Sequence, residues 1–198
     1  MLTLVRHGQS AANARGLMCG RSDPPLTDTG RRQARALASG LPRPTRLLSS
    51  PLARARETAA LLGADVPVEI DPRWTEMDYG DLDGQPMTAL DGEAWRTWQA
   101  DPDHVPAGGE SLAAVRARVA AACTELADEA ARGEVVVVSH VSPIKAAISW
   151  ALGVGIEIAW RMYLLDAAVC RIDTSGPVPL LLAVNDEGPL HAGTVQPA

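Results

Sequence analysis

Residues 1–13, MLTLVRHGQSAAN, join a short apolar run directly to a polar turn. The apolar residues 2–5 predict a buried β-strand. Arg6 and His7 follow at the point where such a strand leaves the carboxyl edge of a sheet, and ligands bind at that edge in open α/β folds. Arginine offers a charged fork for phosphate or carboxylate, and a neutral imidazole is a competent nucleophile. The stretch predicts one wall of an anion-binding site, with a plain surface turn as the alternative.

A second strand of the same kind ends in a histidine. The four valines at 135–138 predict a strand buried on both faces, and Ser139 and His140 follow it. Pro143 predicts the start of the next helix, which has an apolar face along residues 144–151. A histidine of this type usually only packs in a core. Two histidines at two strand ends instead favour a shared site.

The rest of the chain alternates short apolar runs with helical patterns, which is typical of an α/β fold. Further strands are predicted at residues 46–50, 66–70, 167–172 and 178–184. Further helices are predicted at residues 31–41, 51–62, 111–131 and 156–163, with Ser111 as an N-cap. Trp95 and Trp98 also stand at helical spacing, where such pairs pack in a core or a lid.

Composition limits the classes of function. With 198 residues, 46% of them hydrophobic, the chain suits one globular domain. The formal net charge of −6 argues against a nucleic acid or an acidic membrane as partner. Cys19, Cys123 and Cys170 fit neither a disulfide framework nor a zinc knuckle. No apolar stretch reaches the length of a membrane span and no targeting segment precedes the first strand, so we expect a cytoplasmic protein.

Two arginines and a cluster of acids are further candidates. Arg54 and Arg56 lie early in one predicted helix but face different sides, so only one reaches the sheet edge, and spacing alone leaves open which. Acidic side chains crowd residues 76–83. Their spacing lacks the EF-hand pattern of a calcium loop. A single carboxyl group acting as a general acid is the favoured interpretation of this segment.

Four motifs occur in one order along the chain: LVRHGQS at 4–10, SSPLARARETA at 49–59, the E-x-x-x-G-x-x-x-G that begins at Glu76, and VVSH at 137–140. In this combination the chain resembles the histidine phosphatase superfamily over nearly its whole length. The resemblance implies a phosphoglycerate-mutase-like α/β fold, a three-layer sandwich with a mostly parallel central sheet flanked by helices. It implies one domain over residues 1–198, in which residues 77–110 form a lid or specificity insertion.

The resemblance also implies roles for single residues. His7 would be the nucleophile that accepts the phosphoryl group, and Glu76 would donate a proton to the leaving oxygen. The phosphoryl oxygens would be bound by Arg6, Arg54 and His140. The resemblance thus implies that Arg54, and not Arg56, is the arginine of this helix that reaches the site. The remaining polar substrate contact would come from Asn13.

The expected function is metal-independent hydrolysis of a small phosphorylated metabolite through a phosphohistidine, without a cofactor. Many members of the family carry Gly-Gly after the second histidine, where this chain has Val141-Ser142. The VSHVSPIK form looks more like the acid phosphatase and cobalamin-pathway branch than the mutases, which are typically longer. A phosphoglycerate mutase and an inactive phospho-ligand binding module are the alternatives. The sequence leaves a homodimer open.

Overall fold

A six-stranded mixed β-sheet forms the centre of the molecule in the computed structural model, which describes residues 1–186. The strands lie in the order β3-β2-β4-β1-β5-β6. The strands β1 to β4 are parallel to one another, β5 pairs antiparallel to β1, and β6 pairs antiparallel to β5 at the edge of the sheet. Their bounds are β1 Leu2–Arg6, β2 Arg46–Ser49, β3 Val68–Ile70, β4 Val135–Ser139, β5 Val169–Asp173 and β6 Leu180–Asp186.

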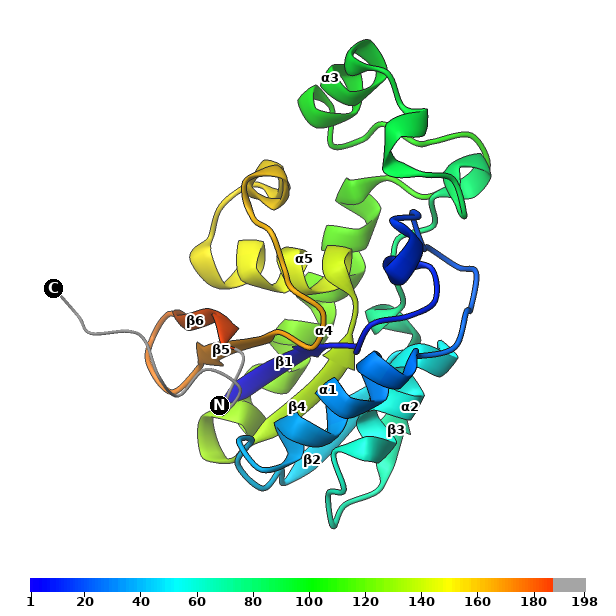
Figure 1. The fold of residues 1–198 in the computed structure, drawn as a ribbon. Coiled ribbons are helices and arrows are strands. Elements are labelled where there is room, and N and C mark those ends of the chain that lie inside the picture. The colour runs from blue at the N-terminus through cyan, green and yellow to red at the C-terminus, as the bar shows by residue number, and fades with distance from the viewer. Residues whose placement is uncertain (187–198) are drawn as a thin grey trace, which may run out of the picture.

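Helices cover both faces of this sheet, which confirms the predicted three-layer α/β sandwich (Figure 1). One face carries α1 and α2, and the other carries α4 and α5. The α-helices are α1 Asp28–Ala38, α2 Ala53–Leu61, α3 Gly92–Ala100, α4 Leu112–Arg132 and α5 Val141–Leu152. Short 3-10 helices are η1 Asn13–Arg15, η2 Pro72–Trp74, η3 Gly80–Leu82, η4 Met87–Ala89 and η5 Ile156–Arg161.

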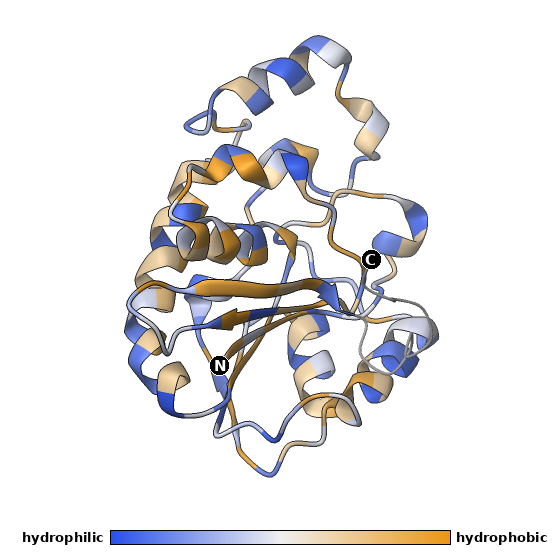
Figure 2. Cartoon of the chain, turned by 90° about the vertical axis from the view of Figure 1, so that its left-hand side faces the viewer, coloured by the Kyte–Doolittle hydropathy of each residue, from blue (hydrophilic) through white to orange (hydrophobic). Residues whose placement is uncertain are grey.

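The valines of β4 show why this strand lies at the centre. Val135 and Val137 pack into the cluster that contains the apolar faces of α4 and α5. Val136 and Val138 point to the opposite face and pack with residues of α1 and α2. Because neighbouring side chains of a strand point to opposite faces, an unbroken apolar run suits only a strand buried on both sides. In Figure 2 the strands are accordingly orange between the two helical layers.

Several predicted element boundaries are wrong, as three examples show. The helix predicted from Pro143 begins at Val141, because proline is tolerated in the first turn, where its missing N–H would have no intrahelical partner. The helix predicted from residue 31 begins at Asp28, where the Thr27 side chain accepts a hydrogen bond from the Gly30 N–H. The strand predicted from residue 167 begins at Val169.

Two glycines hold the turn after β1 directly against the start of α1. A Cβ atom on Gly8 would collide with the carbonyl oxygen of Gly30, and a Cβ atom on Gly30 would collide with the backbone of Gln9. The Gly8 N–H also donates to the Thr58 hydroxyl on α2 at 3.1 Å. The backbone after the first strand is thereby fixed from two helices at once.

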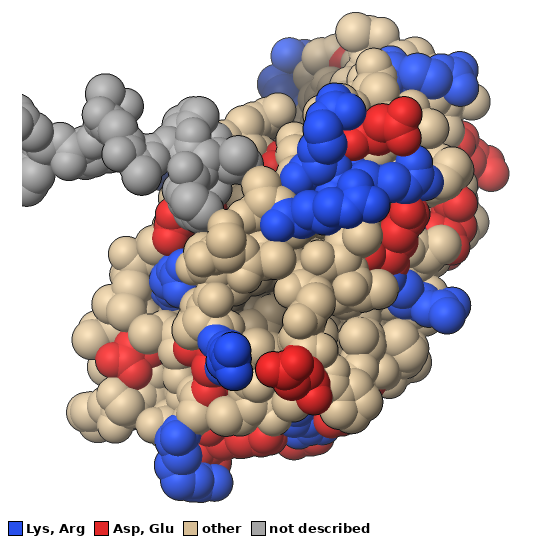
Figure 3. Space-filling view, turned by 60° about the horizontal axis from the view of Figure 1, so that its bottom comes forward, with Lys and Arg blue, Asp and Glu red and all other residues tan. Residues whose placement is uncertain are grey.

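Acidic and basic side chains lie next to one another on the surface in Figure 3. Elsewhere in the fold, ion pairs such as Arg31–Glu57 and Arg46–Glu69 join neighbouring elements. Among the described residues, no helix combines the length and the apolar character that crossing a membrane requires.

Candidate active site

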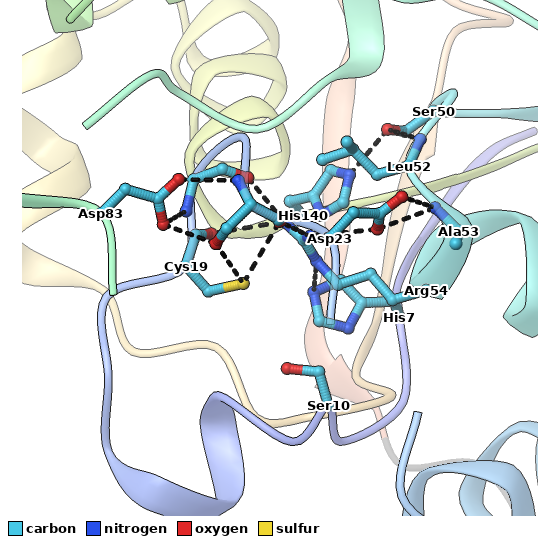
Figure 4. A network of polar contacts seen from close by, with 12 residues as sticks. His7, Ser10, Cys19, Asp23, Ser50, Leu52, Ala53, Arg54, Asp83 and His140 are labelled. Atoms are coloured by element: carbon cyan, nitrogen blue, oxygen red, sulfur yellow. Dashed lines mark hydrogen bonds and ion pairs between the residues drawn. The ribbon is translucent and has the colours of Figure 1, made fainter. Parts of the chain in front are cut away.

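The carboxyl ends of β1, β2 and β4 bring the two strand-end histidines together. Arg6 and Ser139 are register partners on the neighbouring strands β1 and β4, so the residues that follow them, His7 and His140, leave the sheet side by side. Their ring centroids are 5.0 Å apart, with the ring planes at 63°. Ser50, the residue after β2, reaches the same place from the other side of β4 (Figure 4).

His7 is a buried imidazole whose hydrogen bonds define one tautomer. Its Nδ1 lies 2.7 Å from the carbonyl oxygen of Gly8, which can only accept, so Nδ1 carries the proton. Nε2 then keeps a lone pair and accepts from the Nε–H of Arg54 at 3.2 Å. Burial lowers the pKa of His7 well below its ordinary value, and the charges of Arg54 and Arg6 lower it further. The ring is therefore neutral and presents Nε2 as a nucleophilic atom.

His140 is also buried, and one of its ring nitrogens has no hydrogen-bond partner among residues 1–186. Its Nε2 lies 2.7 Å from the Ser50 hydroxyl, which accepts from the Leu52 N–H and can therefore donate its own proton to the ring. That assignment puts the imidazole proton on Nδ1, for which the described structure provides no hydrogen-bond acceptor. Burial, followed by the neighbouring charge of His7, lowers the pKa of His140.

Arg54 is fully buried beside His7 and is held by the loop that precedes α1. Its terminal nitrogens donate to the carbonyl oxygens of Ser22, Gly20 and Cys19 at 2.7, 2.9 and 3.3 Å (Figure 4). Asp23 lies 3.6 Å from the same guanidinium group. Arg56, the other arginine considered from the sequence, is exposed to solvent. The structure therefore brings only Arg54 to the sheet edge.

Arg6 approaches the site from β1. Its guanidinium donates to the Leu164 carbonyl at 2.6 Å and pairs with Asp166 at 2.8 Å. Its Nε–H is buried and has no hydrogen-bond partner within the described residues. Unpaired buried donors are rare in proteins because they cost free energy, so this N–H group is a candidate donor to a substrate.

Glu76 lies against the N-terminus of α5. Its carboxylate accepts from the backbone N–H groups of Val141 at 3.0 Å, Ser142 at 3.2 Å and Met77 at 2.7 Å. Helix N-termini favour negative charge, so this position holds the carboxylate in one orientation. Val141 and Ser142, which replace the expected glycines, thus contribute through their backbone.

Some of these groups line one pocket of about 340 Å³, together with Asn13. The amide oxygen of Asn13 accepts from the backbone N–H and the hydroxyl of Ser10, at 3.0 and 2.7 Å, which leaves its NH₂ group for a ligand. Arg6, His7 and Glu76 line the pocket directly. Arg54 and His140 contact His7 without lining the pocket themselves.

Asp78 and Asp83, two further acids of the 76–83 segment, stabilise loops. Asp83 accepts from the backbone N–H groups of Gly20 and Ser22 and from the Ser22 hydroxyl, at 3.0, 2.7 and 2.7 Å. Burial alone would raise the pKa of Asp83, but these hydrogen bonds outweigh it and lower the pKa. Asp78 accepts from the Gly80 N–H. Asp83 therefore fixes the same loop whose carbonyl groups hold Arg54.

Sequence reasoning missed several residues of this site. Ser50 follows a strand end, which was a usable signal, whereas Asp166 lies in a loop without a recognisable motif. Lys145 is the only lysine of the chain and lines the pocket from α5, on the turn after Val141. Tyr79 lines it from the predicted insertion.

The chain is similar to known proteins along most of its length. Residues 2–187 match the model of the histidine phosphatase superfamily (branch 1). The chain is 33% identical to the adenosylcobalamin/alpha-ribazole phosphatase of Salmonella typhimurium, over 87% of this chain and 89% of that protein. It is also 33% identical to the "Probable phosphoglycerate mutase GpmB" of Cronobacter sakazakii, over 86% and 83% of the two chains. Of the bifunctional protein Rv2228c from Mycobacterium tuberculosis it spans 47%.

A solved structure has the same fold. The alpha-ribazole phosphatase from Shigella flexneri superposes with a TM-score of 0.82 at 30% sequence identity, covering 94% of this chain and 96% of that one. Fold, family model and relatives agree, and the chain belongs to branch 1 of the histidine phosphatase superfamily and is an enzyme of the histidine phosphatase type.

Proposed function

We propose that the protein is a metal-independent phosphomonoesterase that hydrolyses a small phosphorylated metabolite through a phosphohistidine at His7. The observation that carries this proposal is the hydrogen-bonded state of His7. Its proton is fixed on Nδ1 by Gly8, the lone pair of Nε2 accepts from the Arg54 Nε–H, and the residue lines the pocket. A neutral, oriented imidazole among cations is the arrangement that nucleophilic attack on a phosphate ester requires.

Binding of the phosphoryl group uses the donors that have no partner. The Nε–H of Arg6 and the Nδ1–H of His140 are both buried and unpaired in the described structure. Phosphoryl transfer spreads negative charge over three oxygens, and fixed donors and positive charges stabilise that charge. Arg54 and the amide group of Asn13 complete the set in this proposal.

The reaction then runs in two steps. The His7 Nε2 lone pair forms a bond to phosphorus while the bond from phosphorus to the ester oxygen breaks, and Glu76 gives its proton to that oxygen. In the second step the ionised Glu76 takes a proton from water, whose oxygen bonds to phosphorus as the bond to Nε2 breaks. Inorganic phosphate leaves, and His7 is neutral again.

The test of this mechanism replaces the proposed nucleophile, and a histidine outside the site is replaced as a control. His7→Ala abolishes phosphate release from p-nitrophenyl phosphate, whereas His104→Ala, in the loop before α4, retains it. EDTA leaves the wild-type rate unchanged. Strong inhibition by EDTA contradicts the metal-free mechanism, and an active His7→Ala variant contradicts the nucleophile. Rapid quenching with radiolabelled substrate yields a protein-bound phosphate that is labile in acid and stable in base. An inactive binding module yields no label.

Relatives with different names make phosphoglycerate mutase the second candidate. GpmB carries a mutase name, and the Salmonella relative carries a phosphatase name, at equal identity. Incubation with 3-phosphoglycerate separates the two. Release of inorganic phosphate supports the phosphatase, and faster formation of 2-phosphoglycerate supports the mutase. Parallel assays with α-ribazole phosphate, sugar phosphates and nucleotides rank the substrates.

Residues 77–110 are the specificity insertion in this proposal. Tyr79 and Met87 from this segment line the pocket together with His7. The segment includes α3, which extends beyond the sandwich at the top of Figure 1. A substrate bound at His7 therefore places its alcohol portion against this segment.

A further inference from the structure

A second, smaller cavity opens beside the catalytic pocket. Its volume is about 130 Å³, and it shares five lining residues with the pocket: Met18, Tyr79, Met87, Val141 and Lys145. The two spaces are therefore adjacent, with the phosphate-binding groups in one and the alcohol portion of a bound ester directed towards the other.

Aromatic side chains form the far wall of this cavity. Trp95 and Trp98 of α3 stack with ring centroids 5.6 Å apart, and both meet Trp160 of η5 nearly edge-to-face at 5.8 and 5.7 Å. Tyr79 meets Trp98 edge-to-face at 6.0 Å. These are the arrangements in which aromatic rings attract one another, and a further ring would gain the same contacts.

The size and lining of the cavity favour a single ring. An engineered apolar cavity of about 150 Å³ in another protein accommodates benzene. The methionines at 18, 77 and 87 also line the cavity, together with Leu112, Ser142 and Ala159, and thioethers pack favourably against ring edges. The cavity is too small for a bulky polycyclic group, and its three indoles suit a flat ring better than a branched chain.

Lys145 stands where the two spaces meet. Its ammonium group donates to the Ala159 carbonyl at 2.7 Å, and an ammonium group has three donors, so N–H groups remain for a ligand within the described structure. Burial lowers its pKa, and the charge of Glu76 acts in the opposite direction. The only lysine of the chain thus presents a partly desolvated donor between the reacting phosphate and the aromatic wall.

We propose that the physiological substrate is a phosphomonoester whose alcohol portion is a short, hydroxyl-bearing linker that ends in one aromatic ring. The ring occupies the cavity under Trp95, Trp98 and Trp160, and Lys145 donates to the linker oxygen. This inference rests on the proposed phosphatase function and adds the chemical class of the leaving alcohol. Trp160 and Lys145 become specificity-determining residues.

The first experiment measures kcat/KM for phosphate release from synthetic esters. ω-Phenylalkyl phosphates with one to four methylenes are compared with alkyl phosphates of the same linker length and with the cyclohexyl analogue of the best member. We expect kcat/KM for the best phenyl ester to exceed that for its alkyl counterpart by about tenfold or more, and also to exceed that for the cyclohexyl ester. Equal efficiencies overturn the ring proposal. A wild-type protein that releases phosphate from none of the esters instead contradicts the phosphatase function.

Variants then locate the selectivity. Trp160→Leu lowers the phenyl-to-alkyl ratio of kcat/KM by about tenfold, because it removes one indole from the cavity. Trp150→Leu is the matched control, because Trp150 lies on α5 outside the cavity lining, where its Nε1–H donates to Thr124. This control retains the wild-type ratio. Equal effects of the two variants overturn the assignment of the ring to this cavity.

A separate pair of esters tests the hydrogen bond from Lys145 to the linker oxygen. Wild-type protein hydrolyses 2-hydroxy-3-phenylpropyl phosphate more efficiently than 3-phenylpropyl phosphate, by about tenfold for one hydrogen bond to a charged donor. Lys145→Met brings that ratio to about one, since the variant keeps the apolar stem and loses the N–H donors. A ratio that is unchanged in Lys145→Met overturns the role of Lys145. Because each ratio is measured within one variant, a general loss of activity does not affect it.

Discussion

Replacing Arg54 by methionine tests whether one buried guanidinium both supports the catalytic loop and keeps His7 neutral. The change removes the donors that reach the carbonyl oxygens of Ser22, Gly20 and Cys19. Each lost hydrogen bond costs about 1 kcal/mol, so the free energy of unfolding falls by about 3 kcal/mol. For a chain of this length 1 kcal/mol corresponds to about 2–4 °C, and the melting temperature drops by about 6–12 °C.

The same substitution changes the pH profile. The charge of Arg54 is, after burial, the main cause of the low pKa of His7. Without it the pKa of His7 rises towards 6.5, so the acid limb of kcat/KM moves to higher pH. The value at the optimum falls about 100-fold, as expected when one fixed donor to the transition state is lost.

The assays are thermal melts followed by circular dichroism and kcat/KM for p-nitrophenyl phosphate over a pH series. Arg56→Met is the matched control, because this arginine lies on the same helix and is exposed. It melts within about 1 °C of the wild-type protein, since most surface substitutions change stability by less than about 0.5 kcal/mol. A wild-type melting temperature and acid limb in Arg54→Met, or equal losses in both variants, would refute the reasoning.

Two further predictions concern the partners of the site. Asp166→Asn removes the charge that pairs with Arg6 at 2.8 Å, so the Arg6 guanidinium is held less firmly. We expect KM for a phosphate ester to rise about tenfold while kcat changes less. Steady-state kinetics measure both constants, and an unchanged KM contradicts the positioning role of Asp166. Burial holds the pKa values of His7 and His140 below their ordinary 6.5, so below that pH the unfolded chain binds protons that the folded protein does not. The free energy of unfolding is therefore fully retained above pH 6.5 and declines as the pH falls towards the native-state pKa values. Denaturant melts at several pH values give a shallower decline in His140→Asn, and a wild-type slope in that variant contradicts a buried neutral ring.

The central layer of the fold could be predicted because its signals are local. The valines of β4 and the apolar run of β1 each predict a strand that is buried on both faces. The polar residues that follow each run predict where the strand ends. The parallel arrangement then follows from the helices between them. Boundaries were less accurate where a tertiary contact decides them. The first backbone N–H groups of α5 are satisfied by Glu76, sixty-five residues earlier in the chain, and no local pattern near Pro143 records that contact.

The residues of the candidate site likewise fall into those that a local pattern predicts and those that only the fold brings together. The site residues at strand ends could be predicted from the local sequence pattern. Arg54 could be distinguished from Arg56 only by the family resemblance, because the sequence does not show which side of the helix faces the sheet. The loop carbonyls that hold Arg54 depend on Asp83, and Asp166 reaches Arg6 from the other end of the chain. These partners meet only through the fold. Trp160 is a further example, since it completes a cluster begun by two tryptophans on α3.

The contact between Gly8 and Gly30 has a practical consequence for protein engineering. Because each lacks a side chain where the backbone of the other segment passes, the two positions cannot be varied independently, and a saturation library that includes either one would consist almost entirely of non-folding members. Substitutions that aim to change the preferred ester belong on α3 and η5, whose side chains line the smaller cavity without touching that contact. A directed-evolution experiment can therefore randomise the alcohol side of the pocket while the nucleophile keeps its geometry.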